Sequence, residues 1–283
     1  MARRRPPPRR GRPASRRPAR NRRALLAGGA VAVAAVAAAV WLRPDPPTVA
    51  PVVRPALAAA YPHDSTAFTQ GLVVAGGALY ESTGLYGRST VRRVDLATGR
   101  VLAQRALSDA YFGEGLAALG GRLYQLTWRE GHVFVWDRAT LAPLDTLPLP
   151  GEAWGLAADG GRLVLSDGSD RLRWLDPATL AVAREVAVHD GGRRVGNLNE
   201  LEVVGGLVYA NVWGSARIAV VDGRSGAVVR WLDFGPLQDR HRRSADAVLN
   251  GVAHEPAPGG AGRLLVTGKL WPAVYAVDLD AAD

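Results

Sequence analysis

The chain has 283 residues and no cysteine, and its 35 Lys and Arg against 26 Asp and Glu give a formal net charge of +9. The lack of cysteine excludes disulfides, thiolate nucleophiles and zinc sites built on thiolates. The positive charge is confined to one end, because residues 1–23 hold eleven Arg and no acid, which leaves a net charge of −2 for the rest. We therefore expect no nucleic acid partner.

Three segments precede the folded part. Residues 1–23 are predicted to be an Arg-rich cytoplasmic tail, and the uncharged residues 24–42 a transmembrane or signal-anchor segment. Residues 43–51 form a Pro-rich linker. Because basic residues before a span stay in the cytoplasm, residues 52–283 are predicted to be an exported, extracytoplasmic domain. Anchoring in the membrane and secretion after cleavage of a signal peptide both remain open.

Five copies of one pattern follow, beginning at residues 71, 115, 155, 200 and 251. Each copy has an apolar run, a Gly-rich break and a second alternating run, which is typical of a β-hairpin. Most copies continue with two more strands, as in residues 89–107. Four strands at this period predict propeller blades. The fifth copy lacks a fourth strand, so we expect residues 51–61 to contain a strand that closes the ring. The predicted fold is an all-β, five-bladed β-propeller.

An aspartate ends the third strand of each copy and precedes a turn sequence. We interpret these aspartates as formers of Asx turns between the third and fourth strands, without a catalytic role. They are Asp95, Asp137, Asp176, Asp222 and Asp278.

Two sets of residues at equivalent blade positions depart from the repeat. The first set directly precedes each copy and is mostly polar: Gln70, Glu114, Trp154, Asn199 and Asn250. The second set lies thirteen residues after each start, once an insertion in the last copy is allowed for: Gly84, Trp128, Gly168, Trp213 and Lys269. Folding each hairpin on its turn brings both sets to one end of the channel. Phe68 and Phe112 are predicted to complete an aromatic cup.

Glu114 and Lys269 are the residues of the cup best suited to chemistry. Glu114 lies in YFGEGL, where burial of a carboxyl without a structural partner would be costly. Lys269 is the sole Lys in a chain that otherwise uses Arg, which indicates a need for a compact or deprotonable amine. For Asn250 we favour a structural role at the strand end.

The chain resembles the plant-type glutaminyl cyclases, the glutamine cyclotransferase family also found in bacteria. The shared segments are FTQGL (68–72), FGEGL (112–116), LTW (126–128), EAWGL (152–156), LNELE (198–202), NVW (211–213) and TGKLW (267–271). The resemblance implies conversion of the N-terminal glutamine of peptides or proteins to pyroglutamate with release of ammonia.

The resemblance also implies a pocket, with Glu114 as the catalytic acid and base. Cyclisation moves one proton from the attacking amine to the leaving nitrogen, which one carboxyl can do in sequence. Gln70 and Lys269 are candidates to polarise the amide oxygen, and Asn199 to orient the amine. The predicted substrate-binding walls are Phe68, Phe112, Trp128, Trp154 and Trp213. Family members can hold a structural calcium ion, and no catalytic metal or other cofactor is expected.

Two other classes compete with this interpretation. A metal-dependent lactonase or esterase propeller would need Glu, Asn and Asp ligands converging on one ion, whereas this end of the channel has a Lys and three Trp. A non-catalytic propeller that binds a peptide or a sugar would use the same aromatic cup, and it is the stronger alternative.

Overall fold

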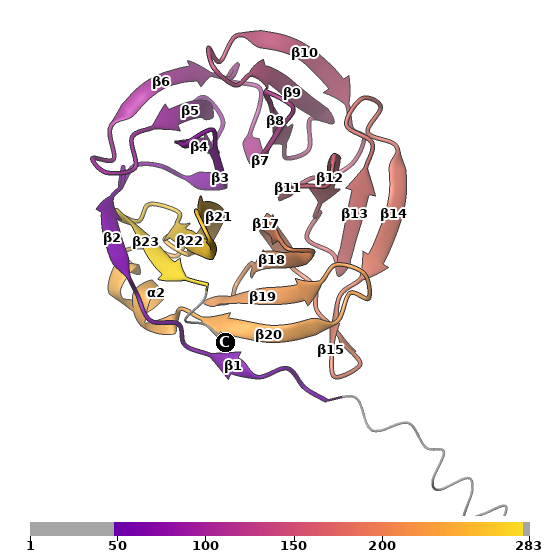
Figure 1. Cartoon of the computed structure of the whole chain (residues 1–283). Coiled ribbons are helices and arrows are strands. Elements are labelled where there is room, and N and C mark those ends of the chain that lie inside the picture. The colour runs from indigo at the N-terminus through magenta and orange to yellow at the C-terminus, as the bar shows by residue number, and fades with distance from the viewer. Residues whose placement is uncertain (1–47, 280–283) are drawn as a thin grey trace, which may run out of the picture. The chain divides into compact units, whose positions relative to one another are not determined.

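The structure is a computed structural model that describes residues 48–279. The predicted tail and the predicted membrane segment, as well as most of the linker, lie outside the described residues. The described part forms five main β-sheets arranged as blades around a common axis (Figure 1). The predicted five-bladed propeller is therefore confirmed for this part of the chain.

The first three blades run outward from the channel in chain order. Blade 1 contains β3 (Thr69–Ala75), β4 (Ala78–Thr83), β5 (Thr90–Val94) and β6 (Val101–Ala106). Blade 2 contains β7 (Gly113–Leu119), β8 (Arg122–Thr127), β9 (His132–Asp137) and β10 (Pro143–Pro148). Blade 3 contains β11 (Leu156–Asp159), β12 (Arg162–Leu165), β13 (Arg171–Leu175) and β14 (Val182–Ala187).

The last two blades include strands from the N-terminal segment. Blade 4 contains β17 (Leu198–Val204), β18 (Leu207–Val212), β19 (Arg217–Asp222) and β20 (Val228–Asp233), and β1 (Val52–Val53) pairs in parallel with β20. Blade 5 contains β21 (Leu249–Ala257), β22 (Gly260–Gly268) and β23 (Ala273–Asp278). Its outermost strand is β2 (Ala59–Pro62), antiparallel to β23.

Turn chemistry explains why the chain folds into these hairpins. In the first blade, Gly76 and Gly77 both have positive φ, as do the Gly-Gly pairs of the next three blades. Two consecutive positive φ values define the turn whose twist matches a two-residue hairpin, and glycine adopts them without strain. The predicted Asx turns form at four aspartates, whose side chains accept hydrogen bonds from backbone N–H groups two or three residues later: Asp95, Asp137, Asp176 and Asp222.

The channel is narrow because the innermost strands approach at backbone contact. A Cβ atom added at Gly71, Gly115 or Gly155 would overlap the backbone of the next blade. The fourth copy has Glu200 at this position. The two oxygens of its fully buried carboxylate accept hydrogen bonds from the backbone N–H groups of Leu72 (3.0 Å) and Val252 (2.6 Å) across the channel.

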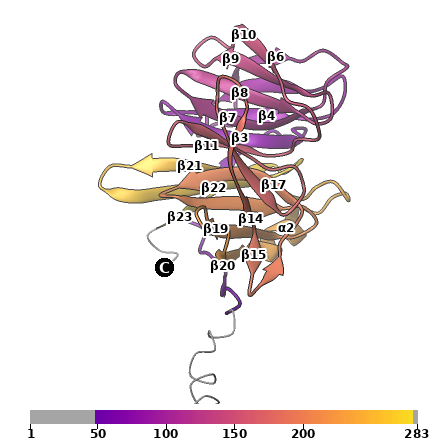
Figure 2. The same cartoon turned by 90° about the vertical axis from the view of Figure 1, so that its right-hand side faces the viewer.

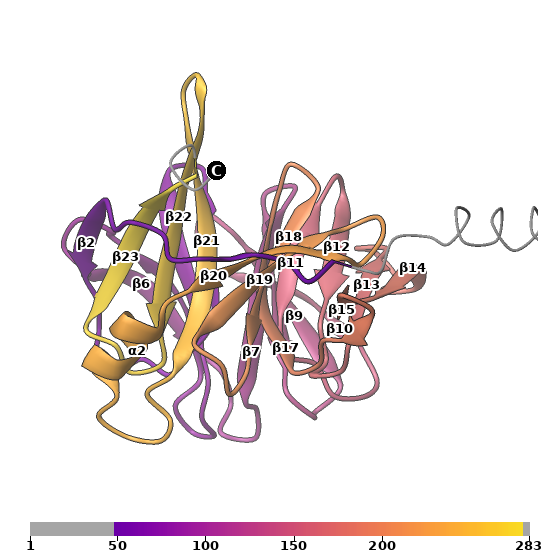
Figure 3. The same cartoon turned by 90° about the horizontal axis from the view of Figure 1, so that it is seen from below.

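Insertions between blades explain the longer repeats at the end of the chain. A two-stranded hairpin, β15 (His189–Asp190) and β16 (Arg193–Arg194), precedes blade 4. The short helix α2 (Gly235–His241) precedes blade 5 and was not expected from the sequence. It lies at the end of the ring opposite the long β21–β22 turn (Figure 3), which projects beyond its neighbours (Figure 2). Among residues 48–279, no helix has the length and hydropathy to cross a membrane.

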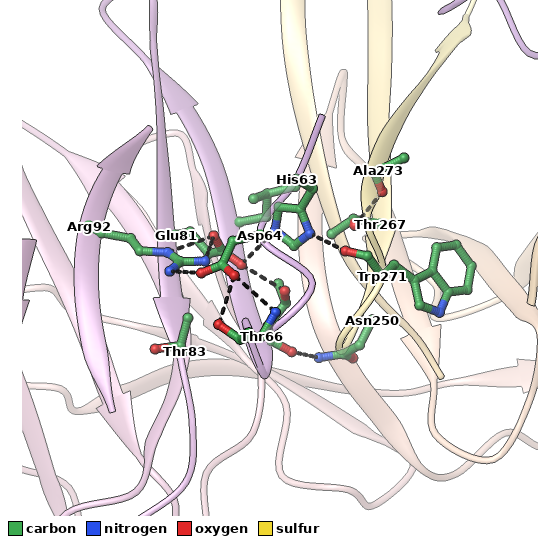
Figure 4. A network of polar contacts seen from close by, with 12 residues as sticks. His63, Asp64, Thr66, Glu81, Thr83, Arg92, Asn250, Thr267, Trp271 and Ala273 are labelled. Carbon is green, nitrogen blue, oxygen red and sulfur yellow. Dashed lines mark hydrogen bonds and ion pairs between the residues drawn. The ribbon is translucent and has the colours of Figure 1, made fainter. Parts of the chain in front are cut away.

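A buried polar network joins blade 1 to blade 5 (Figure 4). We call His63, Asp64, Glu81 and Arg92 the seam network. Glu81 on β4 is fully buried and accepts hydrogen bonds from Arg92 (2.8 and 2.9 Å) and from a ring nitrogen of His63 (3.1 Å). The other ring nitrogen of His63 donates to the carbonyl oxygen of Trp271 in blade 5 at 2.7 Å. Asp64 pairs with Arg92 at 2.9 Å.

Candidate active site

A cavity of about 390 Å³ opens at the end of the channel where the innermost strands begin. All nine predicted site residues line it: Phe68, Gln70, Phe112, Glu114, Trp128, Trp154, Asn199, Trp213 and Lys269. Three further residues, which the sequence did not single out, complete the lining: Arg129, Glu152 and Asp246. The structure thus gathers residues from all five blades into one pocket.

The polar residues of the first set lie in β-bulges. In β3, the pairing with β4 skips one residue between Thr69 and Gly71. The innermost strands β7, β17 and β21 have the same one-residue shift near their beginnings. A bulge takes the extra residue out of the ladder and changes the direction of its side chain. The residues in these bulges are almost fully buried: Gln70, Glu114, Asn199 and Asn250.

Two glycines of the second set provide space for aromatic rings. A Cβ atom at Gly84 would overlap the ring of Phe112, and one at Gly168 would lie 2.7 Å from the indole of Trp154. The other members of this set carry Trp or Lys side chains that line the pocket. The alternation of glycine and large residues around the ring is therefore required by packing.

Glu114 is the central carboxyl of the pocket. Its side chain is buried, and its Oε1 accepts a hydrogen bond of 2.8 Å from the Gln70 amide nitrogen. Burial raises the pKa of Glu114 well above its ordinary value of 4.5. The positive charge of Lys269 opposes this shift, and the negative charges of Glu130 and Glu152 add to it. A carboxylate with a raised pKa is a stronger base than an ordinary one, so it can take up a proton from a substrate and return it.

Asn250 fixes the orientation of Gln70. Its amide nitrogen donates to the carbonyl oxygen of Thr69 (2.9 Å) and to the side-chain oxygen of Gln70 (3.2 Å). The Gln70 oxygen is thereby occupied, so its nitrogen faces Glu114. Asn250 does not line the cavity, in agreement with the structural role expected for it.

Lys269 and Asn199 present polar atoms to the cavity. The Lys269 ammonium lies 4.6 Å from the centre of the Phe68 ring, and burial lowers its pKa from 10.5 although the charges of Glu114 and Asp246 oppose this. Lys269 forms no ion pair within the described part of the chain. The side-chain oxygen of Asn199 is buried and has no hydrogen-bond partner among the described residues. A buried acceptor without a partner is costly, so a bound donor would stabilise it.

The aromatic wall is continuous on both sides of the cavity. Phe112 packs edge-on against Phe68 (centroids 6.1 Å apart) and at a tilt against Trp128 (5.6 Å). Trp154 packs edge-on against Trp213 at 6.1 Å. Trp213 is 53% exposed, which places it at the mouth. Such a wall suits the aliphatic part of a substrate side chain.

Glu152 joins the two tryptophans on either side of it in the sequence. Its Oε1 accepts hydrogen bonds from the indole nitrogens of Trp128 (2.7 Å) and Trp154 (2.9 Å), and its Oε2 accepts one from Arg129 (3.2 Å). Burial would raise the pKa of Glu152, but these donors lower it below 4.5. Glu152 lies in the EAWGL segment, and this segment was the signal that could have identified it.

A calcium ion is not supported by the carboxylates of the described residues. None of these residues belongs to a group of three or more His, Cys, Asp or Glu that could hold a metal ion. The Glu200 carboxyl, on an innermost strand, already accepts backbone hydrogen bonds with both oxygens. We therefore derive no step through a metal.

The chain is similar to one protein family and to two individual proteins. A family model described as glutamine cyclotransferase matches residues 29–279. A glutaminyl-peptide cyclotransferase of Arabidopsis thaliana is 43% identical over 231 residues, which cover 79% of this chain and 71% of the plant protein. The crystal structure of Myxococcus xanthus glutaminyl cyclase matches with a TM-score of 0.75 at 38% identity, covering 83% of this chain and 100% of that one. The match to the family model extends over all five blades.

Proposed function

The chain belongs to the glutamine cyclotransferase family, and from that premise we propose how its pocket works. Its activity is that of a glutaminyl-peptide cyclotransferase, an acyltransferase that acts on peptides with an N-terminal glutamine. The alternative of a non-catalytic binding propeller is not favoured, because the relatives carry the names of enzymes. The observation that supports our assignment of roles is a buried carboxyl, Glu114, in an aromatic pocket that also holds a buried lysine.

The reaction is an intramolecular acyl transfer. The α-amine nitrogen attacks the side-chain amide carbon, a new C–N bond forms, and the bond to the amide nitrogen breaks. Glu114 takes the proton from the attacking amine and gives it to the departing nitrogen, which leaves as ammonia. The two reacting groups belong to one residue, so the pocket mainly needs to hold them in a reactive conformation.

The other polar residues divide the remaining tasks. Lys269 donates to the amide oxygen as negative charge develops there. Gln70 holds the Glu114 carboxyl through the 2.8 Å hydrogen bond, which modifies the role in oxygen polarisation expected from the sequence. The free oxygen of Asn199 accepts a hydrogen bond from the substrate's amine or amide. Phe68, Phe112 and the three tryptophans exclude water.

The activity is tested by incubating the purified protein with a peptide that begins with glutamine. The product is expected to be lighter by one ammonia, as measured by mass spectrometry. A matched peptide that begins with asparagine should remain unchanged, since cyclisation would then give a strained four-membered ring. If the Gln-peptide loses ammonia no faster with the protein than without it, the proposal is refuted.

Replacing Trp213 by Ala is expected to weaken substrate binding more than it slows chemistry. The side chain is an apolar part of the mouth and lies outside the hydrogen-bonded group around Glu114. Loss of such a wall affects substrate and transition state alike, so KM should rise about tenfold with kcat nearly constant. Steady-state kinetics with a Gln-peptide will measure both. A fall in kcat at unchanged KM would instead place Trp213 in the chemical step.

We also propose that residues 24–42 hold the enzyme at a membrane with its propeller on the extracytoplasmic side. The support is the uncharged run behind an Arg-rich tail. Deletion of residues 1–45 is expected to give a soluble enzyme that keeps its turnover and has no affinity for nucleic acid. Fractionation of cells expressing each form will test this proposal. Recovery of the full-length chain in the cytosol would contradict it, and loss of turnover on deletion would show that the domain begins earlier.

A further inference from the structure

We propose that Glu152 is a positioning residue that fixes the angle between the indoles of Trp128 and Trp154, and with it the shape of the pocket. The inference builds on the proposed function, because it concerns the walls that hold the substrate's glutamine. Glu152 lines the cavity at its rim and occupies the repeat position that holds Phe68 and Phe112 in the first two blades.

One oxygen atom of Glu152 accepts hydrogen bonds from tryptophans of two blades. Trp128 follows the second strand of blade 2, whereas Trp154 precedes the first strand of blade 3. Their indole N–H groups donate to the same Oε1 atom at 2.7 and 2.9 Å. Two donors that share an acceptor cannot rotate independently. Glu152 therefore links two blades at the point where their aromatic rings face the cavity.

The second oxygen of Glu152 adds a further constraint. It accepts a hydrogen bond from Arg129, whose guanidinium also lies 3.8 Å above the ring of Trp128. Trp128 is thus held at its nitrogen by Glu152 and on its face by Arg129. Trp154 is held by its hydrogen bond to Glu152 and by packing of its indole against Gly168. Trp213 packs on Trp154 at 6.1 Å, so the same constraint extends to the mouth.

A carboxylate suits this position better than a neutral side chain. Three donors point at it, and an ionised carboxylate offers two oxygens and no hydrogen. Glutamine would keep one oxygen for the two indoles, but its amide nitrogen would face the Arg129 guanidinium, another donor. Alanine would leave both indole N–H groups of the wall without their partner.

The test compares Glu152→Ala and Glu152→Gln with the unmodified full chain. With a Gln-peptide, Glu152→Ala is expected to raise KM about tenfold or more, with a smaller effect on kcat, because the wall binds substrate and transition state alike. Glu152→Gln should recover most of this loss because it retains the acceptor. The matched control is Glu185→Ala, which removes a carboxylate paired with Arg171 and Arg173 on the outer strand of blade 3 and should leave KM unchanged.

Tryptophan fluorescence gives a readout that does not depend on turnover. Freeing two indoles from their acceptor is expected to change the emission maximum or intensity of Glu152→Ala, and to change that of Glu152→Gln less. If the unmodified protein fails to cyclise Gln-peptides, the proposed function fails, and the fluorescence still tests the positioning. Unchanged KM and fluorescence in folded Glu152→Ala would overturn the inference. If Glu152→Ala does not fold, the KM of Glu152→Gln decides. A KM within about tenfold of the unmodified protein's would support the inference, and a larger increase would overturn it, because the variant keeps the shared acceptor.

Discussion

Replacing Glu114 by Gln is expected to lower kcat roughly 10²-fold or more with little change in KM. The substitution keeps the shape of the side chain and an oxygen for the hydrogen bond from Gln70. It removes the group that accepts and returns the proton. Substrate binding depends on the aromatic wall, which the substitution does not touch. Ammonia release from a Gln-peptide, measured under steady-state conditions, gives both constants.

The pH dependence of kcat/KM checks the same assignment. Glu114 must be ionised to take the first proton, and its pKa is raised, so activity should increase through a pH range well above 4.5. Lys269 must be charged to donate, and its pKa is lowered, so activity should fall before pH 10.5. The residual kcat/KM of Glu114→Gln should no longer show the increase that the ionisation of Glu114 causes. A variant with near-normal turnover and the same pH profile would place the proton transfer on another residue.

The blades and the members of the pocket were predictable from the sequence because both depend on repetition. Gly76 and Gly77 form a turn through their own backbone preferences, and the same pair returns in three more copies. Equivalent positions of a propeller converge on the same end of its channel. A residue that departs from the pattern there, such as Glu114 or Lys269, is therefore brought to the site by the symmetry of the fold.

The parts that escaped prediction depend on contacts between blades. The bulge at Gln70 is one extra residue, and no composition signal distinguishes it from a regular strand. The glycine at position 84 was placed in the ring, but its purpose appears only when the Phe112 side chain of the next blade is seen to fill the space. Glu152 occupies the repeat position of Phe68 and Phe112, but its hydrogen bonds to tryptophans of two blades cannot be read from the repeat. Similarly, the partners of His63 are distant in the sequence.

Replacing Glu81 by Gln is expected to destabilise the propeller by about 3–5 kcal/mol, because it breaks a buried ion pair by removing one partner. Glu81 is fully buried and accepts hydrogen bonds from Arg92, His63 and Thr69. Without its charge, the Arg92 guanidinium keeps only the partly exposed carboxylate of Asp64. Urea unfolding will measure the loss. The control, Glu185→Gln, removes the carboxylate that pairs with Arg171 and Arg173 at the surface and should cost little.

The protonation state of His63 makes the same seam sensitive to pH. Its two ring nitrogens face a carbonyl and a carboxylate, which only accept hydrogen bonds, so both contacts are hydrogen bonds when the ring carries both protons. Burial lowers the pKa of His63, but the charge and hydrogen bond of Glu81 and the Trp271 carbonyl raise it above 6.5 overall. A raised histidine pKa stabilises the fold fully below pH 6.5, and this contribution is lost as the pH rises through the folded-state value.

The Glu81 carboxyl makes the unfolding free energy depend on pH in the acidic range. Burial raises its pKa, but His63, Arg92 and Thr69 lower it to about 2 overall, so its contribution is present above pH 4.5 and is lost as the pH falls toward 2. These two residues thus make the unfolding free energy decrease above pH 6.5 and below pH 4.5. The raised carboxyl pKa values of Glu114, Glu200 and Glu202 add to the decrease with rising pH. In Glu81→Gln, His63 loses the charge that holds its second proton, so the unfolding free energy should decrease less above pH 6.5 than it does in the unmodified protein. Equal pH dependence in the two proteins, or a loss of less than about 1 kcal/mol, would show that the seam network does not stabilise the propeller in this way.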